Sequence, residues 1–344
     1  MKAKNAPTDF ARCVTRFLTS HLPSERNLSP LTIKSYSFSL KMFIGYLDSF
    51  EGLKPDRVEL KDITAEKVRA FLASISKSGN VSHSTNNQRL SALKTFVRYA
   101  VLEYPAFIHE GQRILAISSK RGPEHEIVYL EKDAMKALLA IPDQSTVRGR
   151  RDLALLTILY DTGARVEELI NLKVKDIRLV HPETVTLAGK GRKTRTVSIM
   201  AETARVVESY MQDRDFLEQR TCGELHLFNS TNRASFTRPG IAKILKRHFI
   251  SAKQSNPSIN FPDDIHPHAM RASKAIHLLE SGISLIVIRD FLGHVSVSTT
   301  QVYLRVNNQT KRDAIAKAYP SLVEAVPAWR ENSDLMSLLK EMCS

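Results

Sequence analysis

The sequence predicts a mainly α-helical protein with a small β component, in which an N-terminal helical bundle precedes a mixed α/β domain. Three observations support this class. The 344 residues are too many for one typical domain and suit two. Apolar residues recur at helical spacing along most of the chain. Strand-like alternation is confined to two short segments, 183–189 and 195–200.

The first 117 residues are predicted to form the helical bundle. Four segments there place apolar residues at three- to four-residue spacing: 8–22, 29–50, 62–76 and 84–105. Ser29 is a favourable N-cap and Pro30 suits a first helical turn, while Thr64 caps the third segment. No strand pattern interrupts them, so we expect a small bundle of helices alone in this part.

A linker is predicted at 118–128, because Gly122 and Pro123 follow a basic pair there and no apolar period is present. An ordinary surface loop within one domain is the alternative. The second domain is then expected at 129–325, followed by a tail helix at 326–344. In its last fourteen residues the tail places four apolar residues on one helical face: Leu335, Leu338, Leu339 and Met342.

The second domain is predicted to contain helices and one hairpin. The helical segments are 130–142, 147–163, 165–177, 201–217, 239–254, 266–281 and 284–291. The two strands are joined by a short basic turn at 190–194.

The charge balance favours a polyanionic partner. The chain has 50 Lys and Arg against 36 Asp and Glu, a net charge of +14. Nucleic acid is the simplest partner for such an excess, although a ribosomal or membrane-surface protein would share it. The longest apolar run, 153–160, is too short to span a bilayer, and the N-terminus lacks the apolar core of a signal peptide. We therefore expect an intracellular protein without a membrane span.

Arg165 is the first candidate anion ligand. It follows Gly163 at a predicted helix start, where free backbone N–H groups already favour an anion, and its guanidinium matches the geometry of a phosphate. The structural alternative is a helix-surface ion pair with Glu168, three residues later.

A second basic group crowds the predicted hairpin turn: Lys190, Arg192, Lys193 and Arg195. Such a turn can enter a DNA groove and bring a lysine to a phosphate, whereas a solvated basic turn is the structural alternative.

Further along, His268 and Arg271 are three residues apart on a predicted helix that begins at Pro267. Two groups that can repel each other are an unusual structural pair, and an anion between them would explain both.

His294 and Tyr303 complete the set of candidates. A phenol titrates near pH 10 and is a poor nucleophile at neutral pH, but surrounding cations stabilise the charge that develops when it attacks phosphorus. Asp263 and Asp264, which are adjacent in the sequence, are predicted to be helix-capping residues. His, Cys and acidic residues show no metal-ligand spacing, so we predict no metal site.

Four segments together resemble the tyrosine recombinases, or phage integrase family: TGARVEELINL, GKGRKTRTVSI, HPHAMRASKAIHLL and LGHVSVSTTQVYLRV, in that order. The nearest branch contains chromosome-dimer-resolution recombinases and integrases of mobile elements. The spacings are 25 residues from Arg165 to Lys190, 78 to His268, 23 from Arg271 to His294 and nine to Tyr303. The resemblance is close over about 125 to 320. The N-terminal helices match the family's core-binding domain more loosely.

The resemblance implies a role for each candidate at the scissile phosphate. Arg165 and Arg271 would hold the non-bridging oxygens, and His294 would donate a hydrogen bond to the phosphate. Glu168 falls where the family has an acidic residue that steadies the first arginine.

The remaining catalytic roles concern protons and the nucleophile. Tyr303 would attack and form a 3′-phosphotyrosyl bond, Lys190 would protonate the departing 5′ oxygen, and His268 would assist proton transfer. No ATP, metal or other cofactor is implied. One departure is Ala272, which stands where many members have histidine.

The resemblance also implies partners: double-stranded DNA, and self-association to a tetramer in which the helix at 331–344 docks on its own or a neighbouring subunit. Lys41, Lys94 and the basic turn are candidate DNA contacts. The expected location is the cytoplasm, with the nucleoid. Two alternatives stay open: a monomeric type IB topoisomerase-like enzyme, and a non-catalytic DNA-binding relative.

Overall fold

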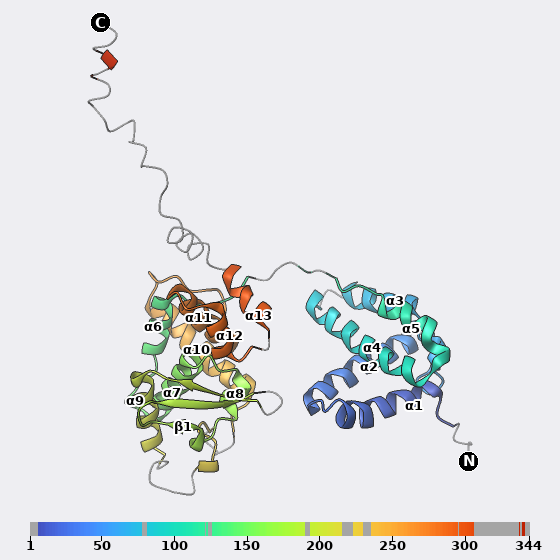
Figure 1. Cartoon of the computed structure of the whole chain (residues 1–344), viewed down its shortest axis with the longest axis horizontal. Coiled ribbons are helices and arrows are strands. Elements are labelled where there is room, and N and C mark those ends of the chain that lie inside the picture. The colour runs from blue at the N-terminus through green and yellow to red at the C-terminus, as the bar shows by residue number, and fades with distance from the viewer. Residues whose placement is uncertain are drawn as a thin grey trace. The chain divides into compact units, whose positions relative to one another are not determined.

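The computed structural model describes residues 6–77, 81–120, 122, 126–189, 193–214, 223–229, 235–294, 296–305, 337 and 339–340. The chain divides into two compact units, Met1–Glu124 and His125–Ser344. Helices dominate both units and the second also holds a small sheet, so the predicted fold class is confirmed (Figure 1). The tail helix predicted at 326–344 falls almost wholly outside the described residues.

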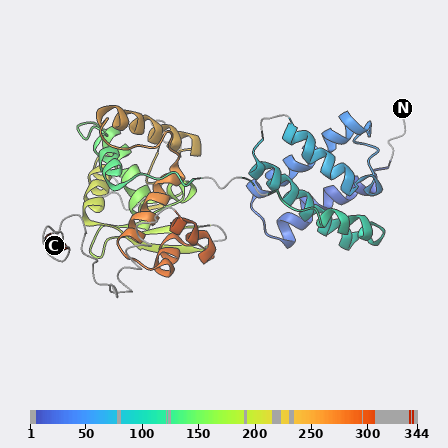
Figure 2. The same cartoon turned by 90° about the horizontal axis from the view of Figure 1, so that it is seen from above.

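The N-terminal unit packs helices around one apolar core (Figure 2): α1 (Asp9–Arg16), a π-helical continuation (Phe17–Glu25), α2 (Pro30–Glu51), α3 (Ala65–Lys77), α4 (His83–Glu103) and α5 (Ile108–Leu115). The start signals of α2 act as predicted, because Ser29 accepts a hydrogen bond from the backbone N–H of Thr32 and Pro30 lies in the first turn. Phe17 packs edge-on against Phe96 of α4, with ring centroids 5.4 Å apart.

Helix α5 was not among the four predicted helices. Gly111 lies within its eight residues, and a central glycine argues against a helix. A Cβ at Gly111 would meet Val101 Cγ2 of α4 at 2.3 Å. The glycine therefore allows α5 to approach α4 closely, a tertiary reason that local sequence does not reveal.

The second unit contains helices α6 (Lys132–Ala140), α7 (Val147–Asp161), α8 (Val166–Ile170), α9 (Ala201–Gln212), α10 (Arg238–Ser255), α11 (Pro267–Glu280), α12 (Leu285–Leu292) and α13 (Val297–Gln301). Three antiparallel strands form its sheet in the order β1 (Ile177–Arg178), β2 (Thr184–Ala188) and β3 (Thr194–Ser198). Leu187 of β2 pairs with Arg195 of β3. In this register Arg195 lies on β3 with its side chain reaching Glu168 of α8.

The helix predicted at 165–177 is wrong beyond Ile170. The backbone N–H of Lys173 donates to the Asp176 side chain at 2.9 Å, and a single 3-10 turn leads from there into β1. The side chain thus replaces the helical partner of that N–H group. The two predicted strands correspond to β2 and β3, and β1 is an additional strand of two residues.

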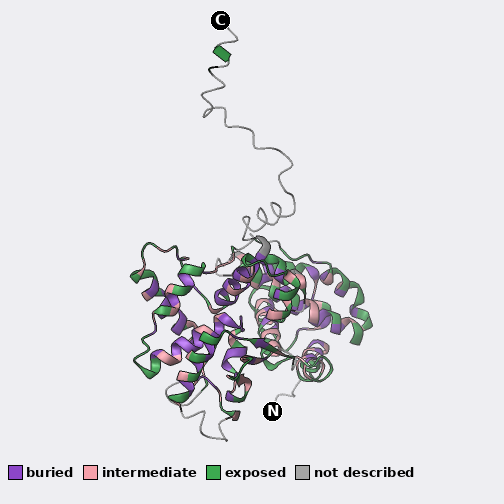
Figure 3. Ribbon diagram, turned by 60° about the vertical axis from the view of Figure 1, so that its left-hand side comes forward, coloured by how far each residue is buried: buried purple, intermediate pink, exposed green. Residues whose placement is uncertain are grey.

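Helix α7 forms the centre of the second unit's core. Its buried apolar residues include Leu153, Ala154, Leu155, Leu156, Ile158 and Leu159, and its exposed residues are confined to the first turn. Figure 3 shows the buried residues of the molecule in purple. A helix that is apolar on nearly every side must be surrounded by other elements. No helix among the described residues is nevertheless long and apolar enough to cross a membrane.

Asp161, at the end of α7, ties three helices together. Its carboxylate accepts hydrogen bonds from the backbone N–H of Met200 (2.8 Å) and the hydroxyl of Thr203 (2.9 Å) at the start of α9. It also pairs with Lys274 of α11 at 2.9 Å. The Asp161 side chain is only 6% exposed and that of Lys274 15%, so each charge depends on the other.

We expect Asp161→Ala to lower the free energy of unfolding by about 3 kcal/mol, because the change leaves the Lys274 ammonium without its buried partner. Urea denaturation followed by circular dichroism measures the loss. The control is Asp264→Ala, since Asp264 pairs with Lys246 at the surface and its removal should change stability little. Equal losses in the two variants would contradict the assigned role of Asp161.

His277 is a buried histidine on α11. Its Nδ1 lies 2.9 Å from the hydroxyl of Tyr160, and burial, followed by the charge of Lys132, lowers its pKa to about 4. Between about pH 6.5 and about pH 4, the imidazole therefore binds a proton in the unfolded chain but not in the folded chain.

From this linkage we expect the free energy of unfolding to fall as the pH drops from about 6.5 to about 4. His277→Gln keeps a hydrogen-bonding group beside Tyr160 but does not titrate. Over the same pH interval the free energy of unfolding should fall less in this variant than in the unaltered chain, and the two losses should differ by up to about 3 kcal/mol. Urea titrations at several pH values test this, and parallel pH profiles would disprove it.

Candidate active site

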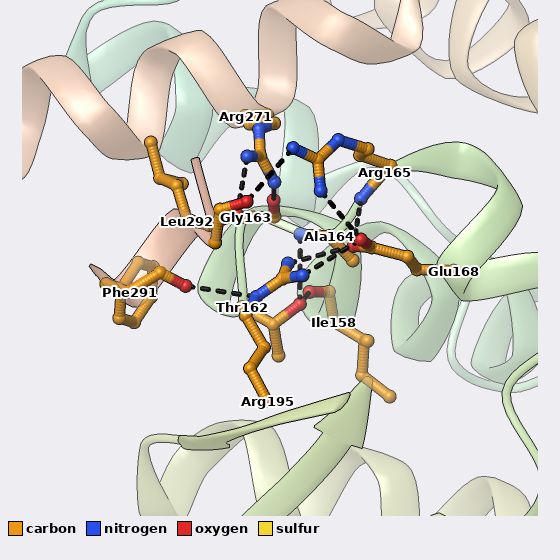
Figure 4. Close-up of polar contacts among 11 residues, drawn as sticks. Ile158, Thr162, Gly163, Ala164, Arg165, Glu168, Arg195, Arg271, Phe291 and Leu292 are labelled. Carbon is orange, nitrogen blue, oxygen red and sulfur yellow. Dashed lines mark hydrogen bonds and ion pairs between the residues drawn. The ribbon is translucent and has the colours of Figure 1, made fainter. Parts of the chain in front are cut away.

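The site begins at the turn between α7 and α8. Gly163 has φ +56°, and a Cβ there would meet Leu292 Cδ2 at 2.7 Å. A side chain at this position would therefore strain the backbone and push the Leu292 side chain aside. The hydroxyl of Thr162 donates to Ile158 O and accepts from the N–H of Ala164 (Figure 4). The turn is thus fixed on both sides of the glycine, just before Arg165.

Glu168 is a buried carboxylate held by two arginines (Figure 4). It accepts hydrogen bonds from the Arg165 backbone N–H (2.9 Å) and guanidinium (2.8 Å), and a two-pronged pair from Arg195 at 2.8 Å each. Burial alone would raise the pKa of Glu168, but these hydrogen bonds hold it below its usual value. The carboxylate therefore stays ionised and restrains the Arg165 guanidinium, whose side chain is 43% exposed.

Arg271 is fully buried on α11. It donates to the carbonyl oxygens of Gly163 and Leu292, each at 2.6 Å, while its Nε has no hydrogen-bond partner. Burial, and then the charges of Arg165 and Arg195, lower its pKa to about 10. Arg271 consequently remains a cation at neutral pH, and it joins the turn at Gly163 to the end of α12.

The end of α12 gathers three arginines. The carbonyl of Phe291 accepts from Arg195 Nε at 3.1 Å, and Leu292 O accepts from Arg271. Gly293 O lies 3.4 Å from an Arg165 terminal nitrogen, the longest of the three contacts. The carbonyl groups at a helix C-terminus carry partial negative charge. They and Glu168 therefore offset three positive charges brought close together.

His294 follows this helix end directly. Gly293 has φ +64° and caps α12 in the left-handed conformation. His294 Nδ1 lies 2.9 Å from the hydroxyl of Thr300, which is fully buried. Burial, followed by the charges of Arg271 and Arg165, lowers the pKa of His294 to about 4. The imidazole is therefore neutral at pH 7.

Tyr303 lies against His294. The two rings are stacked at 19° with centroids 6.4 Å apart, and Tyr303 is only 5% exposed within the apolar cluster formed by α11 and α12. Burial raises the pKa of Tyr303, while the charges of Arg271 and Arg165 oppose that rise. The phenol therefore lies within electrostatic reach of both arginines despite its apolar surroundings.

His268 lies in the first turn of α11, three residues before Arg271, and its side chain is exposed. Partial desolvation, and then the charges of Arg271, His266 and Arg165, lower its pKa. The ring of the preceding His266 is stacked with that of His268, with centroids 6.4 Å apart.

The basic turn is described only in part, because Lys190 and Arg192 fall outside the described residues. Lys193 is exposed, and its carbonyl accepts from the N–H of Gly189 at 2.7 Å, which closes the hairpin. A Cβ at Gly189 would lie 3.5 Å from Glu168 Oε1, so the end of β2 borders the carboxylate.

Three predicted DNA contacts differ in their surroundings. Arg195 has a side chain only 14% exposed and is turned inward to Glu168. In the N-terminal unit, Lys41 is exposed on α2, whereas Lys94 of α4 is half-buried and has a pKa lowered by desolvation and by Arg98. In the part of the chain that the structure describes, no three His, Cys, Asp or Glu side chains gather as metal ligands would.

Known proteins are similar to this chain in both sequence and fold. The profile described as phage integrase family matches residues 128–310, and that of the phage integrase N-terminal SAM-like domain matches 14–104. A putative integrase/recombinase, y4rC of Sinorhizobium fredii, is 31% identical over 333 residues, which cover 97% of this chain and 98% of that protein. Tyrosine recombinase XerD of Listeria monocytogenes is 33% identical over 302 residues, or 86% and 95% of the two chains.

Solved structures repeat the fold at lower identity. The XerH site-specific recombinase bound to difH substrate, a pre-cleavage complex, has a TM-score of 0.64 at 23% identity over 86% of this chain and 81% of its own. The Tn1549 transposon integrase in complex with transposon right end DNA has a TM-score of 0.68 at 15% identity, over 89% and 98%. On the strength of the family profile and the sequence relatives, the chain belongs to the phage integrase family, the tyrosine recombinases that cut and rejoin DNA.

Proposed function

We propose that this chain is a site-specific DNA recombinase that cuts and rejoins double-stranded DNA through a 3′-phosphotyrosyl intermediate on Tyr303. The observation that carries the proposal is the meeting of Arg165 and Arg271 at the end of α12, directly before His294, whose ring stacks with that of Tyr303. Arg165 lies more than a hundred positions before the other three residues in the sequence. The two arginine charges act on both Tyr303 and His294.

The two arginines would bind the scissile phosphate and stabilise the charge that develops on its oxygens. Arg165 is the exposed member, and Glu168 fixes its guanidinium from one side. Arg271 is held by two carbonyl groups and keeps an unpaired Nε. Groups held in this way need little rearrangement during the reaction, which is what makes electrostatic stabilisation effective.

His294 would act as a neutral hydrogen-bond donor. When its Nδ1 accepts the hydroxyl hydrogen of Thr300, its Nε2 carries the ring proton and can donate it in a hydrogen bond to a phosphate oxygen. The low pKa of His294 favours this neutral form at pH 7. Thr300 thereby becomes a supporting residue that selects the tautomer.

The proposed chemistry balances without an added reagent. The phenolic oxygen of Tyr303 forms a bond to phosphorus, and the bond from phosphorus to the 5′ oxygen breaks. The phenolic proton passes to His268, and Lys190 protonates the departing oxygen. Religation is the reverse reaction, with the 5′ hydroxyl of a strand as nucleophile. No cofactor or metal is required, because the phosphotyrosyl bond conserves the energy of the broken bond.

The proposal extends to the DNA partner, the assembly and the location of the chain. The net charge of +14 supports binding to DNA, and related recombinases have been solved in DNA complexes. We propose that the chain acts as a tetramer on two duplexes, with the helix at 331–344 as a subunit contact and 129–325 as the catalytic domain. Its site of action would be the cytoplasm, with the nucleoid, on a mobile element or the chromosome.

The central test is Tyr303→Phe. The target DNA is first selected from a random library by binding to the full chain, and a nick next to the cleavage position then traps the covalent intermediate. We expect the variant to lose the covalent protein–DNA complex, because the attacking oxygen is gone, and to keep its DNA affinity. Denaturing gels measure the complex and gel-shift titrations the affinity.

A matched control is Tyr129→Phe, since Tyr129 packs against the same apolar cluster as Tyr303. This control should form the adduct as the unaltered chain does. An adduct in Tyr303→Phe would identify another nucleophile and sink the proposal.

A second test separates recombination from topoisomerase-like relaxation. Two labelled duplexes that carry the selected site are incubated with the chain, and strand transfer between them is measured. We expect recombinant products whose yield rises steeply with protein concentration, because a tetramer must assemble. Relaxation of supercoiled DNA without strand transfer would instead favour a monomeric enzyme.

A further inference from the structure

Arg195 joins three parts of the site that come from distant segments. From β3, its two terminal nitrogens donate to the two oxygens of Glu168, and its Nε donates to the carbonyl of Phe291 at the end of α12 (Figure 4). The side chain is only 14% exposed, and each of its three nitrogen atoms donates to another part of the protein. A guanidinium committed in this way has little left to offer a DNA phosphate.

The first consequence concerns Arg165. Glu168 receives two hydrogen bonds from Arg165 and two from Arg195, so the carboxylate is held from both sides. Without Arg195, a buried carboxylate would keep one guanidinium partner in place of two, and its orientation would no longer be fixed. The exposed guanidinium of Arg165 would then lose the fixed partner that aims it.

The second consequence concerns His294. A Cβ at Gly293 would lie 3.1 Å from Arg195 Cδ, so the arginine packs directly against the turn before His294. Together with the bond to Phe291 O, this contact sets the position of the turn relative to β3. Arg195 thus influences both the phosphate ligand Arg165 and the proposed donor His294 without reaching the phosphate.

We propose that Arg195 is a positioning residue for DNA cleavage, which acts through Glu168 and the end of α12 and not through contact with DNA. This inference rests on the proposed function. It replaces the expectation that Arg195 contributes to a DNA-binding turn, and it distinguishes Arg195 from Lys193, two residues earlier, which is exposed.

The test is Arg195→Gln in the full chain, with DNA affinity and cleavage rate measured separately. We expect the rate of adduct formation at saturating DNA to fall by about ten- to a hundred-fold, since aligned groups lose their support. The slope of log affinity against log salt should stay unchanged, whereas a lost phosphate contact would reduce it by about 0.9. Arg205→Gln is the control, because Arg205 is exposed and pairs only loosely with Glu202 at 3.8 Å.

A double-mutant cycle with Glu168→Gln asks whether Arg195 acts through the carboxylate. If it does, the double variant should lose about as much rate as the more damaged single variant, because both changes break one unit. Arg195→Lys provides a second, better tolerated variant. It keeps the charge but cannot span both carboxylate oxygens and Phe291 O, so we expect a smaller rate loss with the same unchanged salt slope.

Three results would overturn the inference: a salt slope reduced by about one with the rate at saturation intact, multiplicative losses in the double variant, or a full rate in Arg195→Lys. Each is interpretable only through the adduct formed by the unaltered chain. If the unaltered chain forms no adduct, the proposed function fails and this inference with it. An adduct in the unaltered chain combined with any of the three results removes the inference alone.

Discussion

The candidate site depends on how three arginines, two of them largely or fully buried, are kept close together. Arg165, Arg195 and Arg271 would repel one another, and burial adds a cost for the charges of Arg195 and Arg271. One ionised carboxylate, Glu168, and three successive carbonyl groups at the end of α12 compensate them. The compensation is incomplete, and a cluster with surplus positive charge is suited to receive a phosphodiester anion.

The same contacts explain why short elements matter in this unit. Helix α8 has five residues and α12 has eight, too few to be stable by themselves. Each is fixed by hydrogen bonds from arginines on other elements, so the local structure and the site stabilise each other. An anion bound at Arg165 would therefore meet groups whose positions are already set by β3, α8, α11 and α12.

Much of this arrangement was accessible from the sequence. Helical periodicity gave the fold class, and ordered motifs indicated Arg165, Glu168, Arg271, His294 and Tyr303 as one group. For Arg195 the sequence predicts a solvated or DNA-facing side chain, because its burial depends on strand register and on the distant end of α12. Thr300 could not be found for a similar reason, because its single contact with His294 has no periodic or spacing signal.

Gly163 limits how this protein can be redesigned. Its left-handed backbone disfavours any side chain, and a methyl group there would meet Leu292 Cδ2 at 2.7 Å and displace it. Directed evolution toward new DNA sequences should therefore hold this position constant, together with the residues at the end of α12. Randomisation belongs on outward-facing side chains such as Lys193, where diversity does not disturb the packing that aligns the arginines.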